Sequence, residues 1–318
     1  MLRYTIKRLL MVIPMLILLS IALFIGMEMV PVDPLLYLVD PNRPNVDQNI
    51  ELLRESLGLN DPLPIRYVKW VGRTLRGDFG YSLLTGAAIS TMVKNRLPAT
   101  LELSIAALVI STILGIAAGF ISAIKQNTFI DYFNSAMGLT VISIPNFFVG
   151  MSMIFIFAVK LNWLPVGGRL VYGSETFLDR LPHLILPALA LGLVSMASLM
   201  RTTRASMLDV LNADYIKTAR SKGLSKNKVH IKHALGNAMI PIMLTLVFRL
   251  PMLIGGAVAI ETVFMWTGMG QMMIQGSQTN DYPVVMATVM ATSAVSLVAS
   301  VLADIFTAAL DPRVRLGK

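Results

Sequence analysis

The sequence predicts an all-α integral membrane protein with six transmembrane helices, and its composition is the first reason. Of the 318 residues, 55% are hydrophobic and only 14% are charged, and the mean hydropathy is +0.68. In soluble domains, roughly a quarter of the residues are charged. The chain is therefore too apolar for a soluble fold, and a lipid bilayer is its expected surrounding.

Apolar stretches long enough to cross a bilayer are the second reason. A hydrocarbon core about 30 Å thick requires about 20 apolar residues in a helix. Five predominantly apolar stretches without Asp, Glu, Lys or Arg have 19 to 28 residues, and a sixth is equally apolar but holds Arg249 near its middle. The charge-free stretch 262–280 has 19 residues as well, but it is rich in Gly and Gln. The predicted transmembrane helices are residues 9–29, 98–124, 132–159, 181–204, 238–260 and 282–308.

Basic residues predict the orientation of these helices. Of the 27 Lys and Arg residues, 15 fall on segments that share a side with the N-terminus, whereas the short loops opposite carry only Lys160, Arg169 and Arg180. Basic residues favour the cytoplasmic side, so both termini are predicted to be cytoplasmic. The cytoplasmic segments are then residues 1–8, 125–131, 205–237 and 309–318, with Arg201 and Arg204 at the adjoining end of the fourth helix, and the extracytoplasmic ones are 30–97, 160–180 and 261–281.

The long extracytoplasmic segment, 30–97, is predicted to fold as a small helical cap. Asp47 is placed to cap a short helix, and Pro62 introduces a second set of apolar residues at helical spacing around Trp70. Pro98 is expected in the first turn of the next membrane helix, where its missing N–H costs least. The segment 261–281 is rich in Gly and Gln and is expected to be a loop.

The cytoplasmic segment, 205–237, predicts two short amphipathic helices. Apolar residues recur at helical spacing as far as Ala219, Gly223 allows a left-handed turn, and Ser225 is placed to cap the second helix. Six Lys and Arg residues surround these helices. The charge alone would fit a solvated loop beside anionic lipid, but the helical order favours an element that docks on another protein.

The sequence lacks the common motifs for nucleotide binding, for serine hydrolysis and for zinc-dependent proteolysis. It contains no phosphate-binding G-x-x-x-x-G-K-[ST], no G-x-S-x-G elbow and no H-E-x-x-H motif. It has no cysteine, and the His230 and His233 pair lacks a nearby carboxylate, so no metal site is predicted. We expect a non-enzymatic protein that binds neither a cofactor nor nucleic acid; its positive charge is interpreted as a topology signal.

Short runs along almost the whole chain resemble the permease subunits of ABC importers for dipeptides, oligopeptides and nickel. The runs are MLRY (1–4), LGLNDPLP (57–64), RLPATLEL (96–103), TARSKGL (218–224), HAL (233–235), GGAV (255–258), ETVF (261–264) and LDPR (310–313). The resemblance implies a type I permease fold in a prokaryotic cytoplasmic membrane. It also implies a homologous second permease, two ATP-binding subunits that hold ATP and Mg²⁺, and an extracytoplasmic solute-binding protein.

The resemblance also implies that the cytoplasmic helices couple the permease to an ATPase subunit. Of the general permease motif E-A-A-x3-G-x9-I-x-L-P, only Ala219, Gly223 and Leu235 are matched. The candidate coupling residues are Asp214, Tyr215, Lys217, Thr218, Ala219, Arg220, Lys222, Gly223 and Leu224.

Arg249 is the main candidate for the translocation pathway. A charge at such depth in a helix should face water or a partner. An ion pair would satisfy Arg249, and the acids that could form it are Glu28, Glu102, Glu261 and Asp304. A further explanation is that the Arg249 side chain snorkels towards the membrane interface. The other pathway candidates are Pro251, Pro145 and Asn146, where kinks are expected.

Three aromatic residues are candidate contacts for the binding protein: Trp70, Phe264 and Trp266. The last two would equally fit an interfacial aromatic belt.

The leading function is the permease subunit of an ATP-driven importer of di- or oligopeptides. Alternatives are an importer of nickel or another small solute, a secondary transporter acting alone, and a membrane scaffold.

Overall fold

The computed structural model describes residues 2–29, 51, 54–55, 60–169 and 176–310, and within these ranges the regular secondary structure is helical apart from one isolated bridge between Tyr81 and Ala88. Four helices are long and apolar enough to cross a membrane. They are α1 (Leu2–Glu28), α4 (Ile89–Ile124), α7 (Phe177–Leu211) and α13 (Tyr282–Leu310).

Two bent helix pairs supply the other candidate spans. In the first, α5 (Phe129–Ser143) meets α6 (Asn146–Met153) and its π-helical extension η2 (Ile154–Lys160) at 109°. In the second, a continuous helix of α9 (Lys226–Lys228), η3 (Val229–Leu235) and α10 (Gly236–Val247) meets α11 (Arg249–Val263) at 44°. Counting each pair once gives six spans, as predicted.

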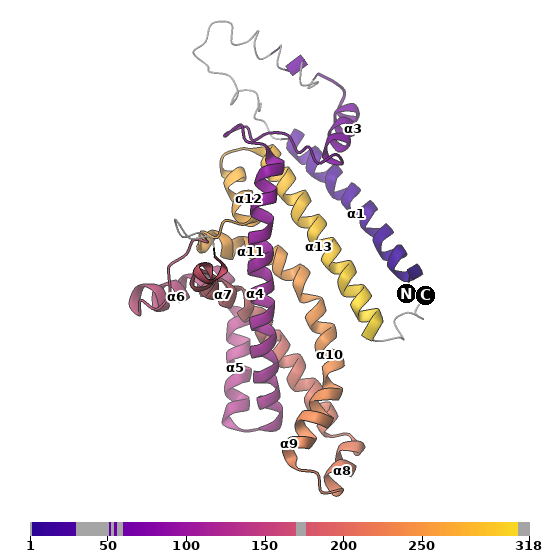
Figure 1. Ribbon diagram of the computed structural model, residues 1–318, viewed down its shortest axis with the longest axis vertical. Helices are drawn as coiled ribbons and strands as arrows, with labels where there is room; N and C mark the ends of the chain where they lie inside the picture. The colour runs from indigo at the N-terminus through magenta and orange to yellow at the C-terminus, as the bar shows by residue number, and fades with distance from the viewer. Residues whose placement is uncertain (1, 30–50, 52–53, 56–59, 170–175, 311–318) are drawn as a thin grey trace.

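Helices α4 and α7 pack along each other at the centre of the bundle (Figure 1). Small residues let them approach closely, as is common between membrane helices. A Cβ on Gly119 would lie 2.5 Å from the Met200 carbonyl oxygen, and one on Gly192 would lie 2.9 Å from that of Ala107. Helix α11 packs against both, which completes a core rich in alanine and leucine.

The first and last helices lie side by side along one flank of the bundle (Figure 1). Arg8 Nη1 of α1 is 2.9 Å from Asp304 Oδ2, near the end of α13. The start of α1 and the end of α13 therefore lie on the same side, which an even number of spans requires. Much of the remaining surface of α1 consists of exposed Leu, Ile and Met side chains, as a lipid-facing helix would present.

The predicted cap contains helix α3 (Leu63–Thr74), which packs on the end of α1 (Figure 1). The centroid of the Phe24 ring lies 5.5 Å from that of the Tyr67 ring and 5.9 Å from that of the Trp70 ring. An ion pair adds to this contact, with Arg66 Nη2 2.5 Å from Glu28 Oε1. Of the predicted preceding helix, Glu51, Arg54 and Glu55 are described and are helical; Asp47 lies outside the described residues.

The structure corrects two predicted boundaries at this end. Helix α4 begins at Ile89, so Pro98 lies inside the helix rather than in its first turn. The predicted loop 261–281 contains helix α12 (Met269–Gln278). The two corrections share a cause, because the early part of α4 and one face of α12 bury each other. Their shared core consists of Ile89, Val93, Met269, Met272, Val284 and Ala287.

Candidate functional site

Helix α8 (Asp214–Ser221) lies beyond the bundle at the end opposite α3, which we call the α8 end (Figure 1). Ile216 is fully buried and holds α8 against Met207 of α7 and Val229 of η3. The predicted glycine turn is confirmed, with φ of +76° at Gly223. The N–H groups of Gly223 and Leu224 donate to the carbonyls of Arg220 and Ala219, the pattern that ends a helix at a left-handed residue.

The second predicted short helix is not a separate element. It starts after Ser225, whose side chain makes no capping hydrogen bond, and runs without a break from Lys226 to Val247. A force applied to α8 or to the start of this helix therefore reaches the membrane segment α10 through continuous backbone.

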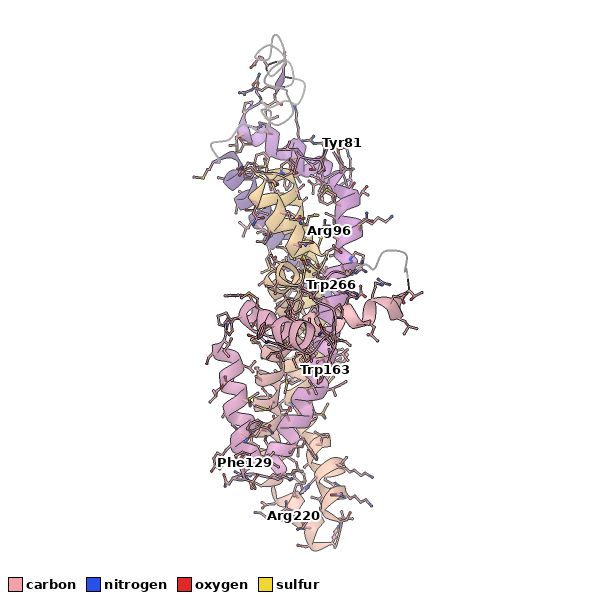
Figure 2. The ribbon with its side chains drawn as sticks, turned by 90° about the vertical axis from the view of Figure 1, so that its left-hand side faces the viewer. Tyr81, Arg96, Phe129, Trp163, Arg220 and Trp266 are labelled. Atoms are coloured by element: carbon pink, nitrogen blue, oxygen red, sulfur yellow. The ribbon has the colours of Figure 1, made fainter. Side chains whose placement is uncertain are left out.

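Most predicted coupling residues face outward from α8 and its glycine turn. The side chains of Ala219 and Leu224 are half-buried against the core of this end. The exposed ones are Asp214, Tyr215, Lys217, Thr218, Arg220, Lys222 and Gly223. Figure 2 shows Arg220 at the far end of the molecule. The outward face thus combines basic side chains with Tyr215, which is 48% exposed.

A buried ion pair that was not predicted from the sequence braces the same end. Arg204 of α7 donates from Nε and Nη2 to the two carboxylate oxygens of Asp131 at 2.6 and 2.8 Å, and Asp131 is 2% exposed. The Asn127 N–H also donates to Asp131, at 3.0 Å. The pair joins the start of α5 to α7. The two residues are 73 positions apart in the sequence, so no local pattern indicates that they meet.

Arg249 lies at the start of α11 and donates from Nη2 to the Ser198 hydroxyl on α7. None of the four acids considered as partners meets it, because each is engaged elsewhere. Asp304 pairs with Arg8, Glu28 with Arg66, Glu102 with Arg169 and Arg180, and Glu261 accepts from Thr100. The ion-pair explanation of Arg249 is therefore wrong for the part of the chain that the structure describes.

Both predicted kinks are present as breaks between helices. Pro145 stands at the N-cap position of α6, where the chain turns by 109°. Pro251 is the third residue of α11, inside its first turn, and the 44° break precedes it at Phe248. A proline in a first turn loses no helical hydrogen bond. In the described ranges, no hydrogen bond joins Asn146 to Arg249.

The described part of the chain leaves one face of α10 and α11 uncovered. Its exposed residues are Asn237, Ile240, Pro241, Phe248, Met252, Gly255, Gly256, Ala259 and Thr262. Beside its three large apolar side chains, this face holds small and polar residues, whereas the exposed residues of α1 are mostly Leu, Ile and Met. Water or a second protein fits such a face better than lipid does.

Two of the three aromatic residues predicted to contact the binding protein lie in the core instead, next to a buried hydrogen-bond network in the half of the bundle nearer α3. Glu261 is fully buried; it accepts from Thr100 Oγ1 at 2.6 Å and from the Gln271 N–H at 3.1 Å. Trp266 Nε1 donates to the Ala99 carbonyl at 2.8 Å. Figure 2 shows Trp266 within the bundle. Phe264 and Trp266 are fully buried, so neither can touch a binding protein directly. Trp70 is half-buried.

The chain is similar to known transport proteins over nearly its whole length. The sequence profile of the binding-protein-dependent transport system inner membrane component matches residues 115–316, and that of the N-terminal part of such components matches residues 1–104. A putative peptide permease protein of Brucella suis is 38% identical, over 99% of this chain and 100% of the relative.

Two further relatives and one solved structure extend the comparison. The oligopeptide transport system permease protein AppB of Bacillus subtilis is 40% identical over 98% of both chains. The glutathione transport system permease protein GsiC of Escherichia coli K12 is 37% identical over 99% of both. The inward-facing MetNI methionine ABC transporter has a chain with a TM-score of 0.57, at 15% identity over 69% of this chain and 96% of that one. At this low sequence identity, the likeness to the MetNI chain shows a similar fold and nothing more.

Proposed function

Because this chain belongs to the family of binding-protein-dependent transport system inner membrane components, as a permease of the peptide and oligopeptide ABC importers, we propose that it forms half of an ATP-driven peptide pathway. The other half is a homologous second permease. Two ATP-binding subunits dock at the α8 end, and a solute-binding protein delivers the peptide at the opposite end. A transporter acting alone is no longer favoured.

The outward face of α8 is the observation that carries this proposal. Ile216 and Ala219 tie α8 to the core, while Tyr215, Thr218 and the basic residues project away from the protein. A rigid short helix with one exposed face fits a groove on another protein. Because η3 and α10 form one helix, a movement of the ATPase subunits at α8 passes into the membrane. This chain then needs no cofactor of its own, since ATP and Mg²⁺ are held by the partner subunits.

The pathway is assigned to the uncovered face of α10 and α11. It includes the break before Pro251 and lies beside Arg249, and its small residues leave room for a solute between two permeases. Pro145 and Asn146, at the turn between α5 and α6, are further pathway candidates. The relatives named for peptides, oligopeptides and glutathione support a peptide substrate. Trp70 on the cap remains the candidate contact with the binding protein.

Cross-linking tests the docking of the ATPase subunits. The chain has no cysteine, so Thr218→Cys can be paired with single cysteines introduced around the nucleotide-binding subunit's docking groove. We expect a cross-link that depends on the cysteine at 218, together with ATP-dependent peptide uptake by the assembled transporter. Thr85→Cys, exposed at the far end, is the matched control and should give none.

Two results would contradict the proposal. The first is purification in mild detergent without any ATPase subunit, combined with no cross-link at 218. The second is cross-linking at 218 while the complete transporter moves no peptide, which would leave the coupling intact and remove the peptide substrate. A panel that includes a nickel complex then identifies the alternative substrate.

A further inference from the structure

Arg249 has a second arginine close to it. Ser198, which accepts the hydrogen bond from Arg249, precedes Arg201 by three residues on α7. Residues three apart on a helix lie on the same face, about 5–6 Å apart at their Cβ atoms. Arg201 is also near enough to Arg249 for their charges to repel each other. Three polar groups, two of them cationic, thus gather where α7 meets the break between α10 and α11.

This arginine pair has no counter-charge in the described part of the chain. Four other arginines that bridge elements are paired with carboxylates: Arg8 with Asp304, Arg66 with Glu28, Arg169 with Glu102, and Arg204 with Asp131. Neither Arg201 nor Arg249 forms an ion pair within the described ranges. Two like charges held together without an anion cost free energy, which a bound anion would recover.

The pair lies beside the uncovered face of α10 and α11, and one of its members is exposed. Arg201 is exposed and Arg249 is half-buried, and Phe248 and Met252 beside Arg249 are exposed on the same pair of helices. Ser198 and Arg201 lie where the charge-free stretch of α7 ends, so the site belongs to the half of the bundle nearer α8. An unpaired charge at such a level is tolerated when it lines water or meets a partner, and is costly against lipid.

We propose that Arg201, Arg249 and Ser198 form a binding site for a carboxylate of the transported solute, which selects peptides with an acidic side chain. The proposal rests on the peptide-pathway function above. A guanidinium group matches a carboxylate with two parallel N–H donors. Ser198 accepts from Arg249 and keeps its own hydroxyl hydrogen to donate to the anion. A peptide with a side-chain carboxylate in addition to its C-terminal one would satisfy both arginines.

The test uses the complete transporter, with its partner permease, ATPase subunits and binding protein, in vesicles of phosphatidylcholine. Initial ATP-driven uptake is measured for Ala-Glu-Ala and Ala-Gln-Ala, each at a concentration that saturates the binding protein. Arg249→Gln and Arg201→Gln should each lower uptake of Ala-Glu-Ala about tenfold, a typical effect of losing a charge-assisted hydrogen bond, and change that of Ala-Gln-Ala less than about twofold.

Lys125→Gln, an exposed basic residue of the same end outside the cluster, should change neither uptake. Arg249→Lys keeps the charge and should keep part of the preference for Ala-Glu-Ala.

Three outcomes would overturn the site. Equal loss for both peptides, with subunits still assembled, would mean that the arginines pair with the second permease. Unchanged uptake of both would mean that the pair binds no solute. A preference that appears only when phosphatidylglycerol is added to the vesicles would make the anion a lipid phosphate. Failure of the unmodified transporter to take up any peptide would instead overturn the peptide function itself, before the variants are compared.

Discussion

At the scale of single residues, charged side chains inside the bundle divide into satisfied and unsatisfied ones. Asp131 and Glu261 are almost or fully buried, and each receives at least two hydrogen bonds. Such groups hold elements in place, since a buried carboxylate that loses its donors is strongly destabilising. Arg249 has one neutral partner and a cationic neighbour. This contrast separates structural charges from the charge that we assign to the pathway.

Substitution of Gly268 tests whether the hydrogen bonds of Glu261 stabilise the fold. A Cβ at position 268 would lie 2.2 Å from Glu261 Oε1, so Gly268→Ala must push the carboxylate away from Thr100 and the Gln271 N–H. We expect the free energy of unfolding to fall by about 2 kcal/mol or more, measured as a lower midpoint of thermal unfolding of the purified chain in detergent.

Gly255→Ala is the matched control, because a Cβ there meets nothing within 4 Å and lies in the middle of α11. It should leave the midpoint unchanged or raise it slightly, since alanine favours a helix over glycine. Equal midpoints for Gly268→Ala and the unmodified chain would show that the carboxylate contributes little to stability.

At the scale of elements, helix ends are set by local residues when solvent surrounds them and by packing when it does not. Gly223 ends α8 by its left-handed conformation, and this could be predicted from the sequence. The start of α4 could not, because Pro98 suggested a boundary. Burial of Ile89 and Val93 against α12 outweighs the cost of an interior proline.

The same distinction explains which parts of the candidate site were predictable. The outward face of α8 follows from helical periodicity, which is a local property. The neighbours of Arg249 do not, since Ser198 is 51 residues away along the chain. Phe264 and Trp266 were misjudged for a similar reason, because glycine and glutamine around them suggested a loop at the surface, whereas both side chains pack into the core formed by α4, α7 and α11.

Substitutions at Gly223 test whether its conformation sets the position of α8. Alanine at φ of +76° costs about 1 kcal/mol or more, so Gly223→Ala should loosen α8 from η3. We expect faster amide hydrogen exchange over residues 214–235. Gly223→Asn should restore much of the protection, because asparagine tolerates left-handed backbone better than other residues.

Gly236→Ala is the control for that series. Gly236 has φ of −55°, and a Cβ added there would meet no atom within 4 Å, so alanine at this position should slow exchange or leave it unchanged. If Gly223→Ala exchanged no faster than Gly236→Ala, the packing of Ile216 alone would hold α8, and the turn would have no role in coupling.

At the scale of the whole molecule, the bundle has two chemically different flanks. The exposed face of α1 consists largely of Leu, Ile and Met, including Leu18 at 68% exposure, as lipid contact requires. The exposed face of α10 and α11 combines Gly, Ala, Asn and Thr with Ile240, Phe248 and Met252, and it lies beside the arginine pair. One chain therefore offers lipid on one flank and a partner or an aqueous path on another, which fits half of a larger pore.

The orientation of the bundle in the membrane is predicted from its charges, and it decides whether α8 can reach an ATPase at all. Of the 27 Lys and Arg residues, 15 belong to segments predicted on the cytoplasmic side. Because the chain has no cysteine, single cysteines report each side cleanly. A membrane-impermeant maleimide should label Thr85→Cys in intact spheroplasts and Lys125→Cys only in inverted vesicles. Both positions are exposed, so the reverse pattern would place α8 outside the cell, away from ATP, and would refute its docking on an ATPase subunit.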